Sequence, residues 1–137
     1  MHQALSEIRR VMKPHGRAIF VVGRESSVRG VSFPNGLLVS GLAELCGFSL
    51  SLRQERKFKN KFGTLIYEDI LHLSLSDTRT RNRSEALHLA VEQLGAKLTP
   101  NLKPDVEKDL RLAIATASCV NPSPLYLAKT NTVALTT

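Results

Sequence analysis

A dense run of positive charge lies in the middle of the chain, with aromatic residues among the cations. Five basic residues occur close together, with one acidic residue between them: Arg53, Arg56, Lys57, Lys59 and Lys61. Phe58 and Phe62 alternate with the lysines. Cations of this kind neutralise phosphates, and an aromatic ring can stack on a base or sugar. The run therefore predicts a nucleic-acid interface; the alternative is a solvated hairpin whose phenylalanines enter the core.

Two more arginines flank a loop that follows an apolar segment. Arg24 and Arg29 lie after residues 18–22, which have the composition of a buried parallel strand. Open α/β sheets bind their ligands at the carboxyl ends of such strands. We therefore add both arginines to the candidate nucleic-acid-binding residues, with simple solvation as the alternative.

No residue pattern predicts a catalytic, cofactor-binding or metal site. Ser26 and Ser27 have no nearby base that would make a nucleophile. Cys46 and Cys119 are too few for a disulfide scaffold, and we expect reduced thiols in apolar helical surroundings, as in a cytoplasmic protein. The histidines lack the spacing of metal ligands; they are His2, His15, His72 and His88.

The size and charge of the chain limit its function. Its 137 residues suffice for one domain with a modest core. No apolar run approaches the ~20 residues of a membrane span, and we expect no membrane partner. The net charge of +7 favours a polyanionic partner; alternatively, the chain has lost an acidic half that once offset this charge.

Periodicity and turn residues predict α and β elements in alternation. Apolar residues at helical spacing precede Pro14, which ends a first helix, and Gly16 turns the chain into the strand 18–22. We expect that strand to be covered on both faces. After a loop at 24–35, in which Asn35 caps the next helix, the predicted elements are a helix at 37–46, a strand at 48–52, a polar connection at 54–61 and a strand at 64–75.

The second half of the chain predicts helices. Residues 76–83 are polar and are interpreted as a linker between a partial α/β domain at 1–75 and a helical extension at 84–124. Apolar stripes predict helices at 83–94 and 105–119. The tail at 125–137 has no clear period, and we expect it to be disordered.

The opening segment LSEIRRVMKPHG at 5–16, together with the strand after it, resembles the class I methyltransferases that use S-adenosylmethionine. The segment from Val21 to Ser26 leading to Gly30 is similar to a loop of bacterial DNA amino-methyltransferases. The run Tyr67-Glu68-Asp69-Ile70-Leu71 looks like part of their final hairpin. The resemblance covers residues 4–74, about half of the chain.

This resemblance implies an α/β fold: the distal half of a Rossmann-like methyltransferase sheet, mixed, with its last strand antiparallel between two parallel neighbours, followed by two C-terminal helices. It also implies methyl transfer to an exocyclic amine of adenine or cytosine. The chain lacks the glycine-rich turn that approaches the methyl donor and the Asp/Asn-Pro-Pro-aromatic motif that holds the target base. We therefore expect no cofactor to bind this chain alone, with S-adenosylmethionine used only by a complete enzyme.

The function predicted is that of a segment of a DNA methyltransferase, supplying substrate-side strands and basic contacts to DNA with low specificity. Two alternatives stay open: a stand-alone nucleic-acid-binding or assembly module, and the second piece of a split methyltransferase. The strand 18–22 needs a neighbour on each side, which predicts a homodimer or a complementing donor-binding chain.

Overall fold

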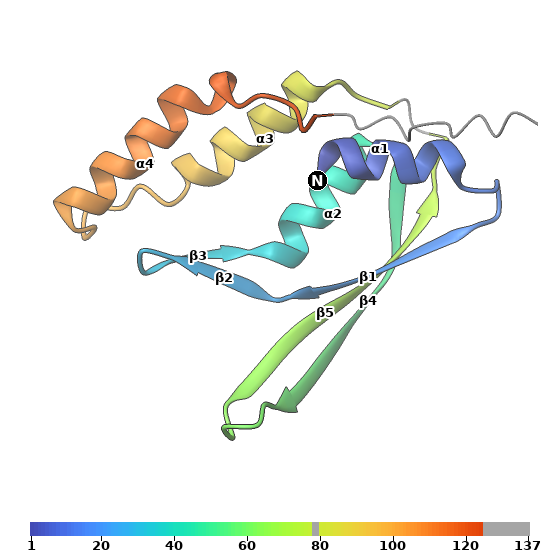
Figure 1. The fold of residues 1–137 in the computed structure, drawn as a ribbon, viewed down its shortest axis with the longest axis horizontal. Helices are drawn as coiled ribbons and strands as arrows, with labels where there is room; N and C mark the ends of the chain where they lie inside the picture. Colours follow the sequence, from blue (N-terminus) through green and yellow to red (C-terminus); the bar gives the residue numbers. More distant parts are fainter. Residues whose placement is uncertain (78–79, 125–137) are drawn as a thin grey trace, which may run out of the picture.

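The computed structural model describes residues 1–77 and 80–124. The first half of the chain contains both helices and strands, and the described elements after Leu75 are helical (Figure 1). In chain order the elements are α1 (His2–Val11), β1 (Arg17–Gly23), β2 (Glu25–Val28), β3 (Val31–Pro34), α2 (Asn35–Leu45), β4 (Phe48–Lys59), β5 (Leu65–Leu75), α3 (Arg83–Gly95), α4 (Pro104–Thr116) and the short 3-10 helix η1 (Ala117–Cys119).

The main sheet has the strand order β1-β5-β4. β5 is antiparallel to both neighbours, so β1 and β4 run parallel to each other on either side of it. The predicted α/β class and the antiparallel orientation of the last strand are confirmed. The prediction of a mixed sheet was wrong for the described residues: β5 lies between β1 and β4, so both strand pairs of this sheet are antiparallel. The methyltransferase assignment stays a prediction.

Helices cover one face of this sheet. Leu5 of α1 and Ala43 of α2 form a buried cluster with Phe48 and Leu73 of the sheet. On the opposite face Ile19 is 56% exposed and Val21 is 52% exposed. The prediction that this strand is covered on both faces was therefore wrong. In the described part of the chain, α1 and α2 pack on one face of the sheet, and α3 and α4 lie on the same side of it (Figure 1).

The segment predicted as a loop at 24–35 contains a second, two-stranded sheet. β2 and β3 pair through Val28 and Val31, which leaves Arg29 and Gly30 as the connecting residues. Both have positive φ, 52° and 82°, as a tight type I′ hairpin turn requires. Asn35 begins α2 and does not cap it, because its side-chain amide donates instead to the Gly23 carbonyl and to Ser26 Oγ.

β4 continues well beyond the strand predicted at 48–52. The residues predicted as a polar connection pair with β5 as far as Lys59 and Leu65. Backbone pairing does not require an apolar face, and an exposed two-stranded ribbon can be polar on both sides. The connection between the strands is therefore a short turn rather than a long loop.

The two predicted C-terminal helices are present, as α3 and α4. They pack against each other and against β3, where Val31 joins Val106 and Leu110 in a second buried cluster. The division into domains at 76–83 stays a prediction, and the tail predicted at 125–137 lies outside the described residues. Within the described ranges, no helix is long and apolar enough to cross a bilayer.

Candidate nucleic-acid interface

The hairpin of β4 and β5 extends away from the rest of the molecule (Figure 1). β1 pairs with β5 only between Glu68 and Ser74. Beyond Glu68 the sheet consists of β4 and β5 alone, paired out to Lys59 and Leu65. We call residues 57–67 the ribbon tip. A ribbon of this kind reaches a partner without competing contacts from the body of the protein.

Three lysines give the ribbon tip its charge. Lys57 and Lys59 are two residues apart on β4 and therefore lie on the same face, while Lys61 lies in the turn. Among the described residues, none of the three has a carboxylate within ion-pair distance. Lys61 Nζ lies 4.9 Å from the centre of the Phe62 ring, and the cross-strand partners of Lys57 and Lys59 on β5, Tyr67 and Leu65, are uncharged. Their charges are therefore available to an external anion.

The turn at the end of the ribbon is held by Asn60. Its side-chain oxygen accepts hydrogen bonds from the backbone amides of Phe62 (2.9 Å) and Thr64 (3.0 Å). The Gly63 amide donates to the Asn60 carbonyl at 3.0 Å, and Gly63 has φ +79°. The turn leaves Phe62 79% exposed, while Phe58 is 41% exposed. The alternative that both phenylalanines enter the core is therefore wrong.

The arginines of the same run are already paired with acidic side chains. Arg56 Nε donates to a carboxylate oxygen of Glu68 at 2.8 Å, and its guanidinium lies 5.4 Å from the Phe58 ring. Arg53 Nη2 donates to Asp69 Oδ2 at 2.8 Å. A phosphate would have to compete with these carboxylates, so the arginines are weaker candidates than the lysines.

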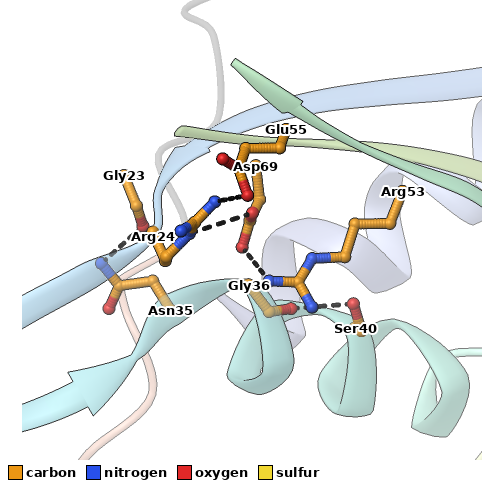
Figure 2. A network of polar contacts seen from close by, with 8 residues as sticks. All are labelled: Gly23, Arg24, Asn35, Gly36, Ser40, Arg53, Glu55 and Asp69. Atoms are coloured by element: carbon orange, nitrogen blue, oxygen red, sulfur yellow. Dashed lines mark hydrogen bonds and ion pairs between the residues drawn. The ribbon is translucent and has the colours of Figure 1, made fainter. Parts of the chain in front are cut away.

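Asp69 is the centre of a buried polar network at the end of β1 (Figure 2). Its side chain is 1% exposed and lies between Arg53 and Arg24, whose Nε is 3.8 Å from Asp69 Oδ1. Arg24 also pairs with Glu55, and its guanidinium lies 4.8 Å from the ring of Tyr67. The network therefore joins the residue after β1 to both strands of the hairpin.

Gly36 lets the first turn of α2 approach this network. A Cβ atom at this position would overlap Asp69 Oδ2, so any larger residue would force the buried carboxylate to move. The next turn is fixed by Ser40 Oγ, which donates to the Gly36 carbonyl at 2.8 Å. Sequence reasoning missed this network. The sequence contained one indication of it. Asp69 lies two and four residues before Leu71 and Leu73, so all three side chains point to the same face of β5, which is buried at these positions.

Arg29 lies on the other hairpin, in the turn between β2 and β3. Its guanidinium pairs with two carboxylates of α4, Asp105 at 2.7 Å and Asp109. These contacts attach the small hairpin to the C-terminal helices. The structure thus brings Arg24 and Arg53 together around Asp69 and places the three lysines on the ribbon tip. Arg29 lies on a different hairpin, and its charge is compensated by two carboxylates. That the seven cations bind nucleic acid stays a prediction.

A cleft of about 1080 Å³ lies between α2, α3 and β4. Its charged lining is mainly acidic, with Glu44, Glu85 and Glu92 beside Arg81 and His88. This charge disfavours a polyanion, so we place the candidate nucleic-acid interface on the ribbon tip rather than in the cleft. The described residues hold no group of three or more His, Cys, Asp or Glu side chains placed to bind a metal ion.

Comparisons with protein-family models, with curated proteins and with solved structures found no match to this chain. The assignment of function therefore rests on the residues and their geometry.

Proposed function

We propose that this chain is the nucleic-acid-binding segment of an S-adenosylmethionine-dependent DNA methyltransferase, and that the ribbon tip makes the contact. The observation that carries the proposal is the group of three lysines without carboxylate partners, Lys57, Lys59 and Lys61, on a protruding ribbon with an exposed aromatic ring at its end. Lysines release condensed counterions when they contact phosphates, which gives affinity without sequence specificity.

The positions of the other charges support a polyanion as the partner. Arg56 and Arg53 lie on the same strand as Lys57 and Lys59, so the positive charge continues from the tip toward the body. Glu68 and Asp69 compensate these two arginines, which makes their contribution secondary. With a net charge of +7, the whole chain attracts DNA at long range and the tip provides the local contact.

The methyltransferase part of the proposal is supported by the resemblance at residues 4–74 and by the antiparallel position of β5 between β1 and β4. We infer that the methyl donor is not held by this chain alone. After β1 the backbone forms the β2–β3 hairpin rather than a glycine-rich turn, and the space beside Gly36 is filled by the carboxylate of Asp69. In a complete enzyme S-adenosylmethionine would supply the methyl group, and we propose that residues outside this chain would hold it.

The test is a DNA-binding titration with a charge-reversal variant of the ribbon tip. Lys57→Glu, Lys59→Glu and Lys61→Glu combined should weaken duplex binding at least about tenfold, since three phosphate contacts are lost and three repulsions are added. The matched control reverses three exposed lysines elsewhere, Lys13, Lys103 and Lys108, for the same change in net charge. If both triple variants weaken binding equally, net charge explains the affinity and the ribbon tip has no special role.

A second candidate function is completion of a split enzyme, in which another chain adds to this sheet. The observation that favours it is the edge position of β1 together with the apolar residues on the uncovered face, Ile19, Val21 and Leu52. An unpaired edge beside exposed apolar side chains promotes association. We expect the isolated chain to self-associate in sedimentation experiments and Ile19→Lys with Val21→Lys to suppress this. A monomer across a wide range of concentrations would count against this candidate.

A further inference from the structure

Phe62 is a large apolar side chain held in solvent by a structured turn. It is 79% exposed, more than any other large hydrophobic residue in the described ranges. Its backbone amide is fixed by Asn60 Oδ1, and Gly63 closes the turn with φ +79°. The backbone that carries the ring is therefore already ordered and holds the ring away from the core. Binding of a ligand to the ring then costs less conformational entropy.

The surroundings of the ring match those of a stacking site for bases. Lys61 Nζ lies 4.9 Å from the ring centre, and Lys59 lies two residues earlier along the chain. Proteins that bind single-stranded nucleic acids combine such cations with aromatic rings on which successive bases stack. A base can stack on a side chain only where it has left its own stack, as in a single strand or at an unpaired position.

We propose that Phe62 is a base-stacking residue, and that it makes the ribbon tip prefer single-stranded or unpaired DNA to an intact duplex. This inference rests on the proposed nucleic-acid binding. In it, the phosphates of either form of DNA are contacted by Lys57, Lys59 and Lys61. Phe62 distinguishes the single strand from the duplex.

The experiment compares the affinity of the full chain for one labelled oligonucleotide as a single strand and as a duplex. Phe62→Ala should weaken single-strand binding at least about fivefold, the loss expected for one stacked base. It should leave duplex affinity unchanged. Phe62→Tyr keeps the ring and should retain the preference. Leu112→Ala removes another exposed apolar side chain, on α4, and should change neither affinity.

The possible outcomes separate this inference from the proposed function. If the lysine charge reversals weaken binding to both forms while Phe62→Ala leaves their ratio unchanged, the stacking role is wrong and DNA binding stands. If the unmodified chain binds neither form, both are wrong. A last measurement uses vesicles that contain anionic phospholipid in place of DNA. If Phe62→Ala weakens vesicle binding but not single-strand binding, the ring contacts a membrane surface and the inference is overturned.

Discussion

At the scale of single residues, Asp69 determines how the hairpin joins the rest of the sheet. Its buried carboxylate accepts from Arg53 and faces Arg24. Removing one member of a buried charged group leaves the others without compensation. Asp69→Asn should lower the free energy of unfolding by about 1–3 kcal/mol. This is less than for a fully enclosed pair, because Arg24 and Arg53 are 30% and 42% exposed.

The neighbouring Glu68→Gln is the control for this substitution. Glu68 pairs with Arg56 near the surface, and surface pairs contribute at most about 1 kcal/mol. Chemical denaturation of the two variants measures the difference. Equal destabilisation by both substitutions would show that the network around Asp69 contributes no more to the free energy of unfolding than a surface ion pair.

Gly36 and Asp69 should also be coupled in stability. Gly36→Ala forces a methyl group against the Asp69 carboxylate, and overpacking of this kind costs about 1–3 kcal/mol. In an Asp69→Ala background the same substitution should cost less, because the clashing atoms are gone. A double-mutant cycle measures the coupling, and additive costs would contradict the close approach of α2 to the sheet.

The two cysteines should differ in reactivity. Cys46 is buried and Cys119 is exposed, contrary to the expectation that both lie in apolar surroundings. Burial raises the pKa of the Cys46 thiol, against the lowering effect of the hydrogen bond with Ser6, so less of it is thiolate near neutral pH. A thiol-specific reagent should modify Cys119 at least about tenfold faster than Cys46, until denaturant exposes the second thiol. Equal rates in the folded protein, or fast labelling that survives Cys119→Ser, would contradict this assignment.

At the scale of secondary-structure elements, the sequence predicted what depends on periodicity and on strong turn residues. The helices α1, α3 and α4 and the strand β5 were predicted near their observed bounds, because their apolar spacing agrees with Pro14, Gly63 and the prolines near α4. Gly47, directly after the C-cap of α2, has φ 78°, the left-handed conformation that favours glycine at this position.

The elements that were missed form through pairing rather than through pattern. The β2–β3 hairpin turns at Arg29-Gly30, which lacks the usual Asn-Gly or Asp-Gly signal. Apart from Phe58, the outer half of β4 is polar on both faces, so it forms a strand through its pairing with β5 rather than through its apolar pattern. The ribbon tip, which carries the candidate site, therefore could not be predicted from sequence, although its lysines were.

The small hairpin gives a test of the role of Arg29. Its pairs with Asp105 and Asp109 attach β2 and β3 to α4. Arg29→Ala should lower the free energy of unfolding by up to about 1 kcal/mol, since all three side chains are about half exposed. It should leave DNA affinity unchanged. A loss of DNA affinity with unchanged stability would instead place Arg29 in the interface.

At the scale of the whole molecule, the chain separates its charges. The ribbon tip is basic, the cleft between α2 and α3 is mainly acidic, and the end of β1 is occupied by a compensated network. After β1 the backbone continues into the β2–β3 hairpin, without the glycine-rich turn that would approach the methyl donor. Calorimetric titration of the isolated chain with S-adenosylmethionine should therefore give a dissociation constant above ~100 µM, that is, binding weaker than about −5.5 kcal/mol. Tighter binding would show that a donor site exists within this chain.

The most direct test of nucleic-acid binding at the ribbon tip is the salt dependence of duplex affinity. Each phosphate contact contributes about −0.9 to the slope of log affinity against log salt, so three lysines account for about −2.7. Replacing Lys57, Lys59 and Lys61 by glutamine should make the slope less negative by about that amount, while the same replacement of Lys13, Lys103 and Lys108 should leave it nearly unchanged. An unchanged slope in the ribbon-tip variant would contradict the proposed interface.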